Sequence, residues 1–360
     1  MAKVIVGMSG GVDSAVAAYL LKEAGHEVIG MTLRTDSRDG RCCEIDDARR
    51  TARKLNIRYY APNVIDVFNE KVKQPFFASY LRGETPNPCV ECNRCVKWDR
   101  MLFYAAALEA DYAATGHYAS VVRLPNGRYT VRQAEHAEKD QTYMLYRLTQ
   151  EQLAHTLMPL GKYSKTEVRR IAEEAGLDVA QKQDSQEICF VTEGSYADYI
   201  LNDPNLTVPG EGNFVSEDGK ILGKHRGIIH YTVGQRKGLI AAGYPIYVKE
   251  IRPETNEVVL GTEESLYTSE VRCGRLNFLS IPGLRPGETL RARVKIRYHH
   301  AGEQAVLLPD GEGSVRIIFD APVRAATPGQ SAVFYDEENR VIGGGIITAG
   351  KSGQTPNDEI

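Results

Sequence analysis

The stretch from residue 4 to residue 21 constrains the fold of this chain most strongly. It reads Val-Ile-Val-Gly-Met-Ser-Gly-Gly-Val-Asp-Ser and continues into Ala-Val-Ala-Ala-Tyr-Leu-Leu. The apolar run, the glycine-rich turn and the helical pattern from Asp13 and Ser14 onward predict a strand, a tight loop and a helix N-terminus. Backbone N–H groups and the helix dipole converge at such a loop, which therefore suits a phosphate or pyrophosphate. Gly10 and Gly11 keep side chains away from those donors.

The loop lacks the lysine of the Walker type, Gly-x-x-x-x-Gly-Lys-Ser/Thr, so an ordinary kinase or GTPase site is disfavoured. A tight turn without any ligand is the alternative, and the Gly-Gly pair beside two hydroxyls and an aspartate argues against it. The pattern Ser-Gly-Gly-x-Asp-Ser resembles the pyrophosphate loop of the N-type ATP pyrophosphatases. That resemblance implies cleavage of ATP between its α- and β-phosphates and transfer of AMP to an oxygen.

Length, charge and cysteine content narrow the class of protein. A chain of 360 residues predicts two or three domains, and a net charge of −3 means that any nucleic-acid surface is a local patch. No stretch approaches the roughly 18 apolar residues of a membrane span, so we expect no membrane partner and a cytoplasmic location. Seven cysteines, an odd number, favour metal ligation or thiol chemistry over a disulfide framework.

The first half of the chain alternates strand and helix patterns. Residues 27–33, 57–62 and 112–115 read as strands, residues 45–55 and 98–110 as helices, and a capping box at Ser164 predicts a helix through residue 175. Alternation of this kind predicts an α/β fold with a doubly wound parallel sheet. Ligands bind at the carboxyl ends of such strands, where Met31 and Gly116 lie. Met31 could pack on an adenine ring, and a plain core position is its alternative.

The second half of the chain has a different residue pattern. Prolines and glycines gather near residues 202–212, and β-like runs follow at residues 246–251, 257–261, 290–298, 315–319, 331–335 and 341–348. We expect an ATP pyrophosphatase catalytic domain over residues 1–207, a central β-rich adaptor domain over 208–274, a C-terminal β-barrel over 275–350 and a disordered tail over 351–360.

Cysteines form the densest chemical signal outside the loop. Cys89, Cys92 and Cys95 follow two prolines at three-residue spacing, which brings their sulfurs together on a turn or a first helical turn. A zinc site would need a fourth ligand, so an iron–sulfur cluster, a redox or nucleophilic thiol and a zinc knuckle all stay open. Cys189 lies between Ile188 and Phe190, where a buried, inert thiol is the alternative to a reactive one.

Several motifs together resemble the tRNA-specific 2-thiouridylases. They occur in the same order and spacing up to about residue 348: the pyrophosphate loop, Thr-Pro-Asn-Pro-x-x-x-Cys-Asn from Thr85, Ala-Thr-Gly-His-Tyr from Ala114, Lys-Asp-Gln from Lys139, Ile-Cys-Phe from Ile188, and Tyr-Thr-Val-Gly-Gln-Arg-Lys-Gly from Tyr231. The resemblance implies a tRNA uridine 2-sulfurtransferase. ATP, with Mg²⁺, would adenylate the C2 oxygen of the wobble uridine, and sulfur would then displace AMP to give 2-thiouridine.

The resemblance also implies roles for single residues. Cys189 would carry sulfur as a persulfide, and Cys92 would attack it to release sulfide or leave a disulfide with Cys189. ATP-binding positions would be Gly7, Met8, Ser9, Gly10, Gly11, Val12, Asp13, Ser14, Met31 and Gly116; target-base positions Asn87, Pro88 and Cys89; and tRNA-binding positions His117, Lys139, Asp140, Gln141, Arg297, Tyr298 and Gln330. The partners would be a tRNA anticodon stem-loop and a persulfide or sulfide donor, such as a cysteine desulfurase or a sulfur-relay protein.

One position departs from the family pattern. Many members have Asp where this chain has Cys89, so a proton-transfer role does not carry over to a thiol. Members with Cys-x-x-Cys and a later cysteine resemble a subset thought to hold a [4Fe-4S] cluster on three cysteines. Our hypothesis is that Cys89, Cys92 and Cys189 ligate such a cluster, with direct persulfide relay as its rival. Cys95 is an extra thiol, and we expect no catalytic role for Cys42 and Cys43.

Basic residues on the β-rich half suggest a phosphate surface. Strand alternation places Arg291, Arg293, Lys295 and Arg297 on one face, and Lys224, Arg226, Arg236 and Lys237 form a second patch. A solvated strand face is the bland alternative. Another AMP-forming pyrophosphatase acting on a small metabolite would leave Cys92 and Cys189 idle. An iron–sulfur or zinc RNA-binding module without chemistry is the alternative from a different class.

Overall fold

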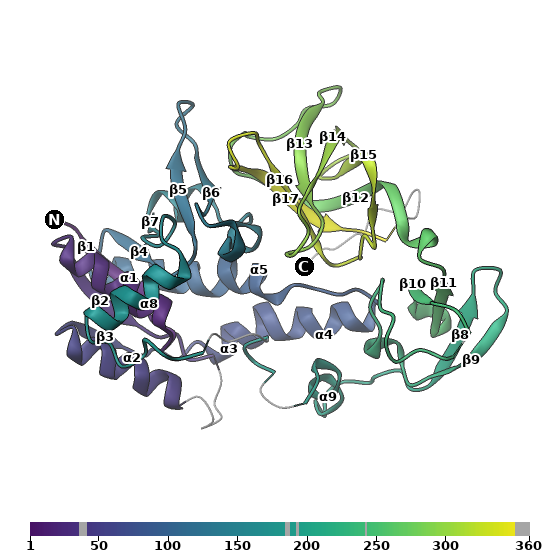
Figure 1. The fold of residues 1–360 in the computed structure, drawn as a ribbon, viewed down its shortest axis with the longest axis horizontal. Coiled ribbons are helices and arrows are strands. Elements are labelled where there is room, and N and C mark those ends of the chain that lie inside the picture. Colours follow the sequence, from purple (N-terminus) through teal and green to yellow (C-terminus); the bar gives the residue numbers. More distant parts are fainter. Residues whose placement is uncertain (36–41, 184–187, 192–193, 242, 350–360) are drawn as a thin grey trace.

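The computed structural model describes residues 1–35, 42–183, 188–191, 194–241 and 243–349. An α/β domain, a small β-sheet and a barrel follow one another along the chain (Figure 1). The predicted fold class, a parallel-sheet domain followed by β-rich parts and a C-terminal barrel, is confirmed. Cys42 and Cys43 begin a helix, but their side chains lie outside the described residues.

A five-stranded parallel sheet organises the N-terminal domain. Its strands, in the order β3-β2-β1-β4-β7, are β3 (Arg58–Tyr60), β2 (Glu27–Met31), β1 (Lys3–Gly7), β4 (Tyr112–Ala114) and β7 (Thr156–Leu157). Val4 and Val6 enter one apolar cluster and Ile5 enters another, because successive side chains of a strand point to opposite faces. Both faces of β1 are therefore covered, which explains why its sequence is apolar throughout.

Helices cover this sheet and extend from it. They are α1 (Val12–Glu23), α2 (Cys42–Lys54), α3 (Ile65–Phe68), α4 (Gln74–Leu81), α5 (Pro88–Cys92), α6 (Asp99–Ala107), α7 (Gln150–Ala154), α8 (Lys165–Glu174) and α9 (Tyr196–Leu201). The capping box predicted at Ser164 is present, with its side chain accepting from the Glu167 N–H. Short 3₁₀ turns occur at Ala137–Lys139, Thr142–Met144, Ile228–His230, Pro253–Thr255 and Glu264–Leu266.

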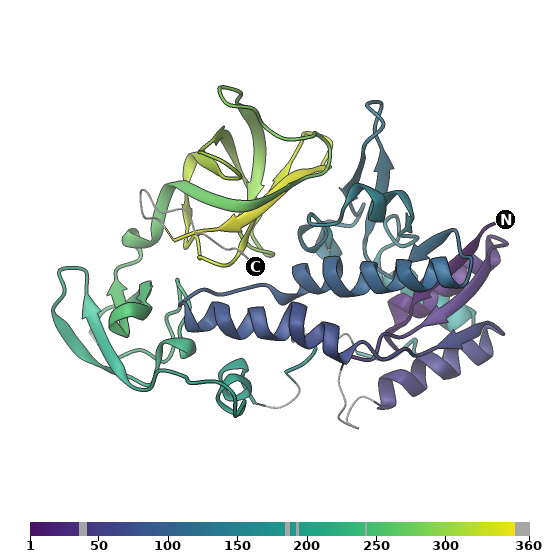
Figure 2. The same cartoon turned by 180° about the vertical axis from the view of Figure 1, so that it is seen from behind.

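Two long helical rods run side by side from the sheet toward the small β-sheet (Figure 2). In one, the π-helical segment Asn69–Lys73 joins α3 to α4; in the other, Asn93–Trp98 joins α5 to α6. The predicted helix at residues 98–110 is thus the end of a longer rod. It starts earlier because Pro88 occupies the first helical turn and the Asn87 side chain accepts from the Cys89 N–H at 3.1 Å.

The β-rich half contains a four-stranded sheet and a closed barrel. The sheet has the order β10-β11-β8-β9, with β8 (Gly212–Ser216), β9 (Ile221–His225), β10 (Tyr247–Arg252) and β11 (Glu257–Gly261). The barrel has the order β12-β15-β14-β13-β16-β17, with β12 (Tyr267–Phe278), β13 (Leu290–Lys295), β14 (Glu303–Pro309), β15 (Val315–Arg324), β16 (Ser331–Tyr335) and β17 (Val341–Ile347).

Some strands were not predicted from the sequence. They include the hairpin of β5 (Ala119–Arg123) and β6 (Tyr129–Gln133), the small-sheet strands β8 and β9, and the barrel strands β12 and β14. Arg275, at a φ of 50°, interrupts β12 with a bulge-like irregularity between Gly274 and Asn277. Cross-strand partners rather than their own propensity stabilise these segments.

Truncating β1 tests the two-sided burial. Ile5 is fully buried, so Ile5→Ala should lower the free energy of unfolding of the α/β domain by about 2–5 kcal/mol. Denaturant unfolding followed by fluorescence of Trp98, the single tryptophan, measures this. The same substitution at Ile221, which is 62 % exposed on β9, is the matched control and should change stability little. An Ile5→Ala loss no larger than the Ile221→Ala loss would contradict the assigned core.

Candidate active site

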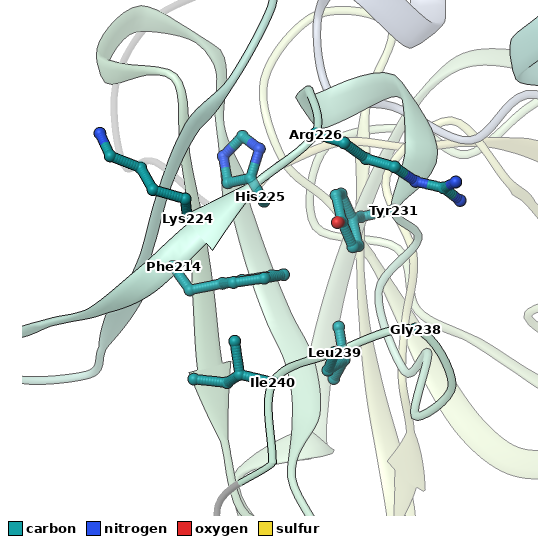
Figure 3. Close-up of a pocket in the computed structure, with 8 residues that line it drawn as sticks. All are labelled: Phe214, Lys224, His225, Arg226, Tyr231, Gly238, Leu239 and Ile240. Carbon is teal, nitrogen blue, oxygen red and sulfur yellow. The ribbon is translucent and has the colours of Figure 1, made fainter.

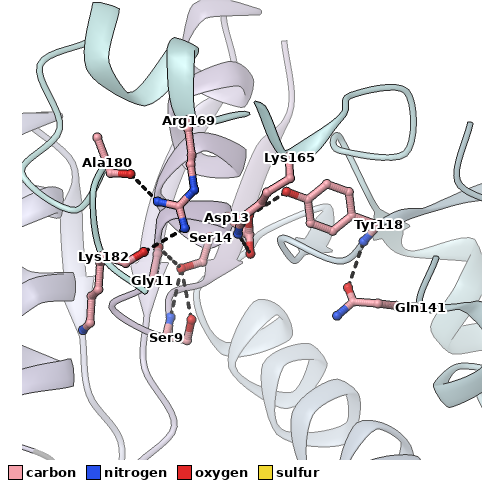
Figure 4. A network of polar contacts seen from close by, with 10 residues as sticks. All are labelled: Ser9, Gly11, Asp13, Ser14, Tyr118, Gln141, Lys165, Arg169, Ala180 and Lys182. Carbon is pink, nitrogen blue, oxygen red and sulfur yellow. Dashed lines mark hydrogen bonds and ion pairs between the residues drawn. The ribbon is translucent and has the colours of Figure 1, made fainter. Parts of the chain in front are cut away.

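The glycine-rich loop lies between β1 and α1, at the carboxyl edge of the parallel sheet. Gly10 has a φ of 73°, a conformation that glycine adopts without strain. The Ser14 hydroxyl fixes the loop, because it accepts from the Ser9 N–H and donates to the Gly11 carbonyl, both at 3.1 Å (Figure 4). Ser14 is buried and Ser9 is exposed, so the open side of the turn faces solvent.

Gly116 follows β4 and touches the start of α1. A Cβ at Gly116 would lie 2.7 Å from both the Asp13 carbonyl carbon and the Ser14 nitrogen, so only glycine fits there. Met31 is 1 % exposed and belongs to the apolar cluster around Ile5. The structure therefore favours the core role for the Met31 side chain, while its carbonyl accepts from the Met8 N–H at 2.8 Å.

Two lysines for which the sequence indicated no role reach the loop. The Lys165 ammonium lies 2.7 and 2.9 Å from the two carboxylate oxygens of Asp13, and the Tyr118 hydroxyl donates to Asp13 at 2.7 Å. The Lys182 ammonium donates to the Gly10 carbonyl at 3.1 Å. The capping box at Ser164 predicted the helix that carries Lys165, but no local signal predicted its direction.

The cysteine helix α5 and Cys189 share one electrostatic environment. Burial raises the pKa of the Cys92 thiol to about 12, and charge on Cys189, Cys89 or Cys95 would raise it further. Burial also raises the pKa of Cys89, again with a contribution from Cys189. Lys97 opposes both shifts. Cys189 itself is exposed, which contradicts the inert, buried alternative for this thiol.

These shifts keep Cys92 protonated at neutral pH. A thiol attacks as its thiolate, so Cys92 is a weak nucleophile in this arrangement and Lys97 is the cation that favours its ionised form. In the part of the chain that the structure describes, no group of three or more His, Cys, Asp or Glu side chains is placed to hold a metal ion. The three cysteines proposed as cluster ligands are thus near one another without forming a ready-made metal site.

Glu91 anchors the cysteine helix. Its carboxylate forms an ion pair with Arg147, which is 7 % exposed, and a longer one of 3.7 Å with Arg275 of the barrel strand β12. Burial, with Arg275 nearby, lowers the pKa of Arg147 to about 10. The Asn93 side-chain amide, also buried, donates to the Met144 carbonyl at 3.0 Å. The helix is therefore held from two sides.

Several residues predicted to bind tRNA have structural partners inside the protein. Asp140 is buried and accepts from the Thr142 hydroxyl and N–H, and Gln141 accepts from the Tyr118 N–H at 3.0 Å. His117 lies 2.7 Å from the Thr115 hydroxyl, and burial holds its pKa well below the usual range. These three residues therefore help to order the segment from Thr115 to Thr142.

Apart from Lys139, the rest of that set comes from the barrel region. Tyr298 packs against Tyr143, with ring centroids 6.1 Å apart, and a charge on Cys89 would raise the pKa of Tyr298 further above its burial-raised value. Gln330 donates to the Thr85 carbonyl at 2.7 Å. Lys139 ends an exposed 3₁₀ turn, and Arg297 is partly exposed. Residues of the barrel region therefore lie next to the segment that leads into α5 and next to Cys89 on that helix.

The basic strand face is largely occupied by protein contacts. Arg291 pairs with Asp320, and Arg293 donates to the Asn339 side chain at 2.8 Å and to Gln133 at 3.1 Å. Burial lowers the pKa of Lys295. The expected row of phosphate contacts is therefore partly engaged by protein groups, although the Arg291 side chain is 59 % exposed.

A cavity of 390 Å³ lies in the small sheet, at the opposite end of the molecule from the loop (Figures 1 and 3). Lys224 and Arg226 flank it, and Phe214, His225 and Tyr231 pack edge to face beneath it. Both His225 ring nitrogens are engaged, with the Asn256 carbonyl and the Gly227 N–H. The cavity is separate from the candidate active site.

Comparison with known proteins gives the family. A profile described as the tRNA methyl transferase HUP domain matches residues 2–193, its PRC-barrel domain matches 205–262, and the aminomethyltransferase beta-barrel domain matches 268–347. Over 96 % of its length the chain is 50 % identical to a tRNA-specific 2-thiouridylase MnmA from Lachnoclostridium phytofermentans, covering 99 % of that protein. The chain belongs to the tRNA-specific 2-thiouridylase family.

Another 2-thiouridylase, from Acetivibrio thermocellus, is 51 % identical over 96 % of this chain and 99 % of its own. Among solved structures, the U34-tRNA thiolase NcsA from Methanococcus maripaludis with its [4Fe-4S] cluster matches with a TM-score of 0.36 at 20 % identity, covering 55 % of this chain and 63 % of that one. Within the described residues of this chain, no helix is both long and apolar enough to span a membrane.

Breaking the Glu91 anchor should destabilise the cysteine helix. Glu91→Gln leaves Arg147 buried without its counter-charge and should cost about 3 kcal/mol of unfolding free energy. Glu70→Gln is the matched control on the neighbouring rod, because Glu70 pairs with Lys71 in solvent, and it should cost less than about 1 kcal/mol. Urea unfolding measures both; equal effects would contradict the anchoring role.

The raised pKa of Cys92 predicts a pH-dependent reactivity. Below a pKa of about 12 the thiolate fraction grows tenfold per pH unit, so iodoacetamide should alkylate Cys92 roughly tenfold faster at each unit from pH 7 to pH 10. Peptide mass spectrometry follows each cysteine separately, and the exposed Cys189 should react before Cys92 at pH 7. Lys97→Met should slow Cys92 further. A rate for Cys92 that levels off by pH 9 would contradict this.

Proposed function

We propose that this chain is a tRNA uridine 2-sulfurtransferase. It activates the C2 oxygen of the wobble uridine with ATP and replaces that oxygen with sulfur, giving 2-thiouridine, AMP and pyrophosphate. The observation that carries the proposal is the pairing of a pyrophosphate-type loop with two electrostatically coupled thiols, Cys92 and Cys189, in one domain. The half-identical relatives named tRNA-specific 2-thiouridylases support it.

The loop suits the first step of the reaction, activation of the uridine oxygen, and the thiols suit the second step, delivery of sulfur. An amide-like carbonyl is a poor electrophile because oxide does not leave, whereas adenylated oxygen leaves as AMP. Attack of the uridine oxygen on the α-phosphorus expels pyrophosphate, whose charge the loop N–H groups and the α1 dipole would stabilise. Activation of this kind requires a nucleophile next, and the thiols of Cys92 and Cys189 are the groups suited to deliver sulfur.

A persulfide relay accounts for sulfur delivery. The exposed Cys189 would accept a sulfur atom from a persulfide donor, such as a cysteine desulfurase or a sulfur-relay protein. Attack of the Cys92 thiolate on the Cys189 sulfur would expel hydrosulfide and leave a Cys92–Cys189 disulfide, which an external thiol must reduce. Hydrosulfide then attacks C2 and AMP departs with the oxygen. Burial of Cys92 would keep it protonated and unreactive between turnovers.

Two cofactors belong to this proposal in different ways. Mg²⁺ fits, because the Asp13 carboxylate is 32 % exposed at the mouth of the loop and a carboxylate oxygen is a preferred ligand of that ion. The ion would offset the charge of the pyrophosphate. Among the described residues no three His, Cys, Asp or Glu side chains are placed to hold a metal ion, and we route no step through a [4Fe-4S] cluster on Cys89, Cys92 and Cys189. Anaerobic purification with iron and sulfide analysis tests the cluster directly.

The alternative of an AMP-forming pyrophosphatase for a small metabolite is not favoured, because the relatives are named for tRNA thiolation. The substrate in our proposal is a tRNA, bound through its anticodon stem-loop. Asn87, Pro88 and Cys89 would contact the target base, since Asn87 caps α5 and Pro88 and Cys89 begin it, on the helix that carries Cys92.

Sulfur incorporation into unmodified tRNA tests the function. Mass analysis of the wobble uridine after incubation with ATP, Mg²⁺ and a persulfide or sulfide source, under anaerobic conditions, should show 2-thiouridine. With a persulfide source, Cys92→Ser and Cys189→Ser should each lower thiolation at least about a thousandfold while pyrophosphate release continues. Cys95→Ser is the matched control and should stay within a few-fold of wild type. No sulfur incorporation by the wild-type protein from either source would overturn the proposal.

A further inference from the structure

The glycine-rich loop carries a negative charge where a polyphosphate would bind. Residues 4–21 contain one charged side chain, the acid Asp13, and no lysine or arginine. A polyphosphate at this loop would meet backbone donors and the helix dipole, together with a carboxylate that repels it. Cations from elsewhere in the fold must therefore balance Asp13 and the phosphates.

Lys165 is the first of these cations. Its ammonium bonds both Asp13 oxygens, at 2.7 and 2.9 Å, and its side chain is 14 % exposed. It is the first residue of α8, a helix whose N-terminus is fixed by the Ser164 capping box and which packs against α1. The Tyr118 hydroxyl donates to the same carboxylate, so Asp13 would keep a donor if Lys165 moved.

Lys182 is the second cation. Its ammonium lies 3.1 Å from the Gly10 carbonyl oxygen and 2.6 Å from a carboxylate oxygen of Asp47. The backbone around it is held by Arg169, which donates to the Ala180 and Lys182 carbonyls at 2.6 and 3.0 Å. Arg169 lies one turn after Lys165 on α8, so one helix positions both lysines (Figure 4).

We propose that Lys165 and Lys182 are the phosphate-binding lysines of this ATP site. They would bind the phosphates in place of the Walker lysine, which the loop lacks. When ATP binds, the Lys165 ammonium exchanges the Asp13 carboxylate for a polyphosphate oxygen, and Lys182 exchanges the Gly10 carbonyl for another. The inference deepens the proposed function, because it rests on ATP being the ligand of the loop.

The exchange is reasonable for lysine in particular. A lysine carries its charge on a flexible stem and donates in any of three directions, so it can move between two nearby oxygen acceptors. Each exchange replaces one charge-assisted hydrogen bond by another of similar strength. Asp13, freed from Lys165, becomes available to a cation that accompanies ATP. The competing explanation is a purely structural role, in which the Lys165–Asp13 ion pair only holds α8 against α1.

Affinity labelling of the wild-type protein separates these explanations without any variant. An adenosine diphosphate ester of pyridoxal carries an aldehyde at its phosphate end. A lysine amine there condenses with the aldehyde, water leaves, and borohydride reduces the imine to a stable secondary amine. Peptide mass spectrometry should find the label on Lys165 and Lys182, with protection by ATP and none by adenosine. Labelling confined to other lysines would overturn the proposal.

Binding measurements give the second test. Lys165→Met and Lys182→Met should each weaken ATP and pyrophosphate binding about ten- to a hundredfold and leave adenosine binding unchanged. Lys165→Arg, which retains the charge and the pair with Asp13, should stay within a few-fold of wild type. Arg170→Met is the matched control, because Arg170 lies on the same helix, is 61 % exposed and pairs with Glu174. It should bind ATP as wild type does.

These outcomes separate a wrong assignment of the lysines from a wrong function. Unchanged ATP affinity in both methionine variants, or an equal loss of ATP and adenosine binding, would overturn the assignment of the lysines. A wild-type protein that binds neither ATP nor pyrophosphate would instead overturn the proposed function. Thermal unfolding of each variant identifies a folding defect, and the affinity label then decides the question on the wild-type protein.

Discussion

Two-sided burial of β1 is the constraint on which the site depends. Val4 and Val6 face one apolar cluster and Ile5 the other, so the strand cannot shift by one residue without exchanging both faces. The turn that follows is thereby fixed at the carboxyl edge of the sheet. Gly116 at the end of β4 touches the same turn so closely that a side chain would collide with it. The crevice between these two strands is where a parallel sheet places its ligand.

Electrostatics then decides what surrounds the turn. A loop with an acid and no base needs cations from distant segments, and α8 supplies them through Lys165 and, by way of Arg169, Lys182. The cysteine helix shows the same dependence on distant charge. Glu91 binds Arg147 and Arg275, while Lys97 opposes the burial that raises the pKa of Cys92. Both halves of the proposed chemistry are thus controlled by residues outside their own motifs.

Thr85 is where the three parts of the molecule meet. Its N–H donates to the Pro328 carbonyl at 2.8 Å, its carbonyl accepts from Gln330, and its hydroxyl lies 3.2 Å from the Thr232 hydroxyl of the small-sheet region. Two residues later Asn87 caps α5, on which Cys89 and Cys92 lie. A displacement of the barrel or of the small sheet would therefore act on the segment that leads to the thiols, which gives RNA contacts a short physical route to them.

The sequence alone determined the features that local chemistry dictates. The apolar run and glycines at residues 4–11 and the Ser164 capping box each act over a few residues, so their patterns predicted the strand β1, the loop and the start of α8. The family motifs predicted which cysteines come together. Tertiary structure alone decided that Met31 belongs to the core, that Asp140 and Gln330 bind protein groups, and that Lys165 faces Asp13 across 152 residues. Burial and long-range ion pairs depend on segments far apart in the chain, and no local pattern records them.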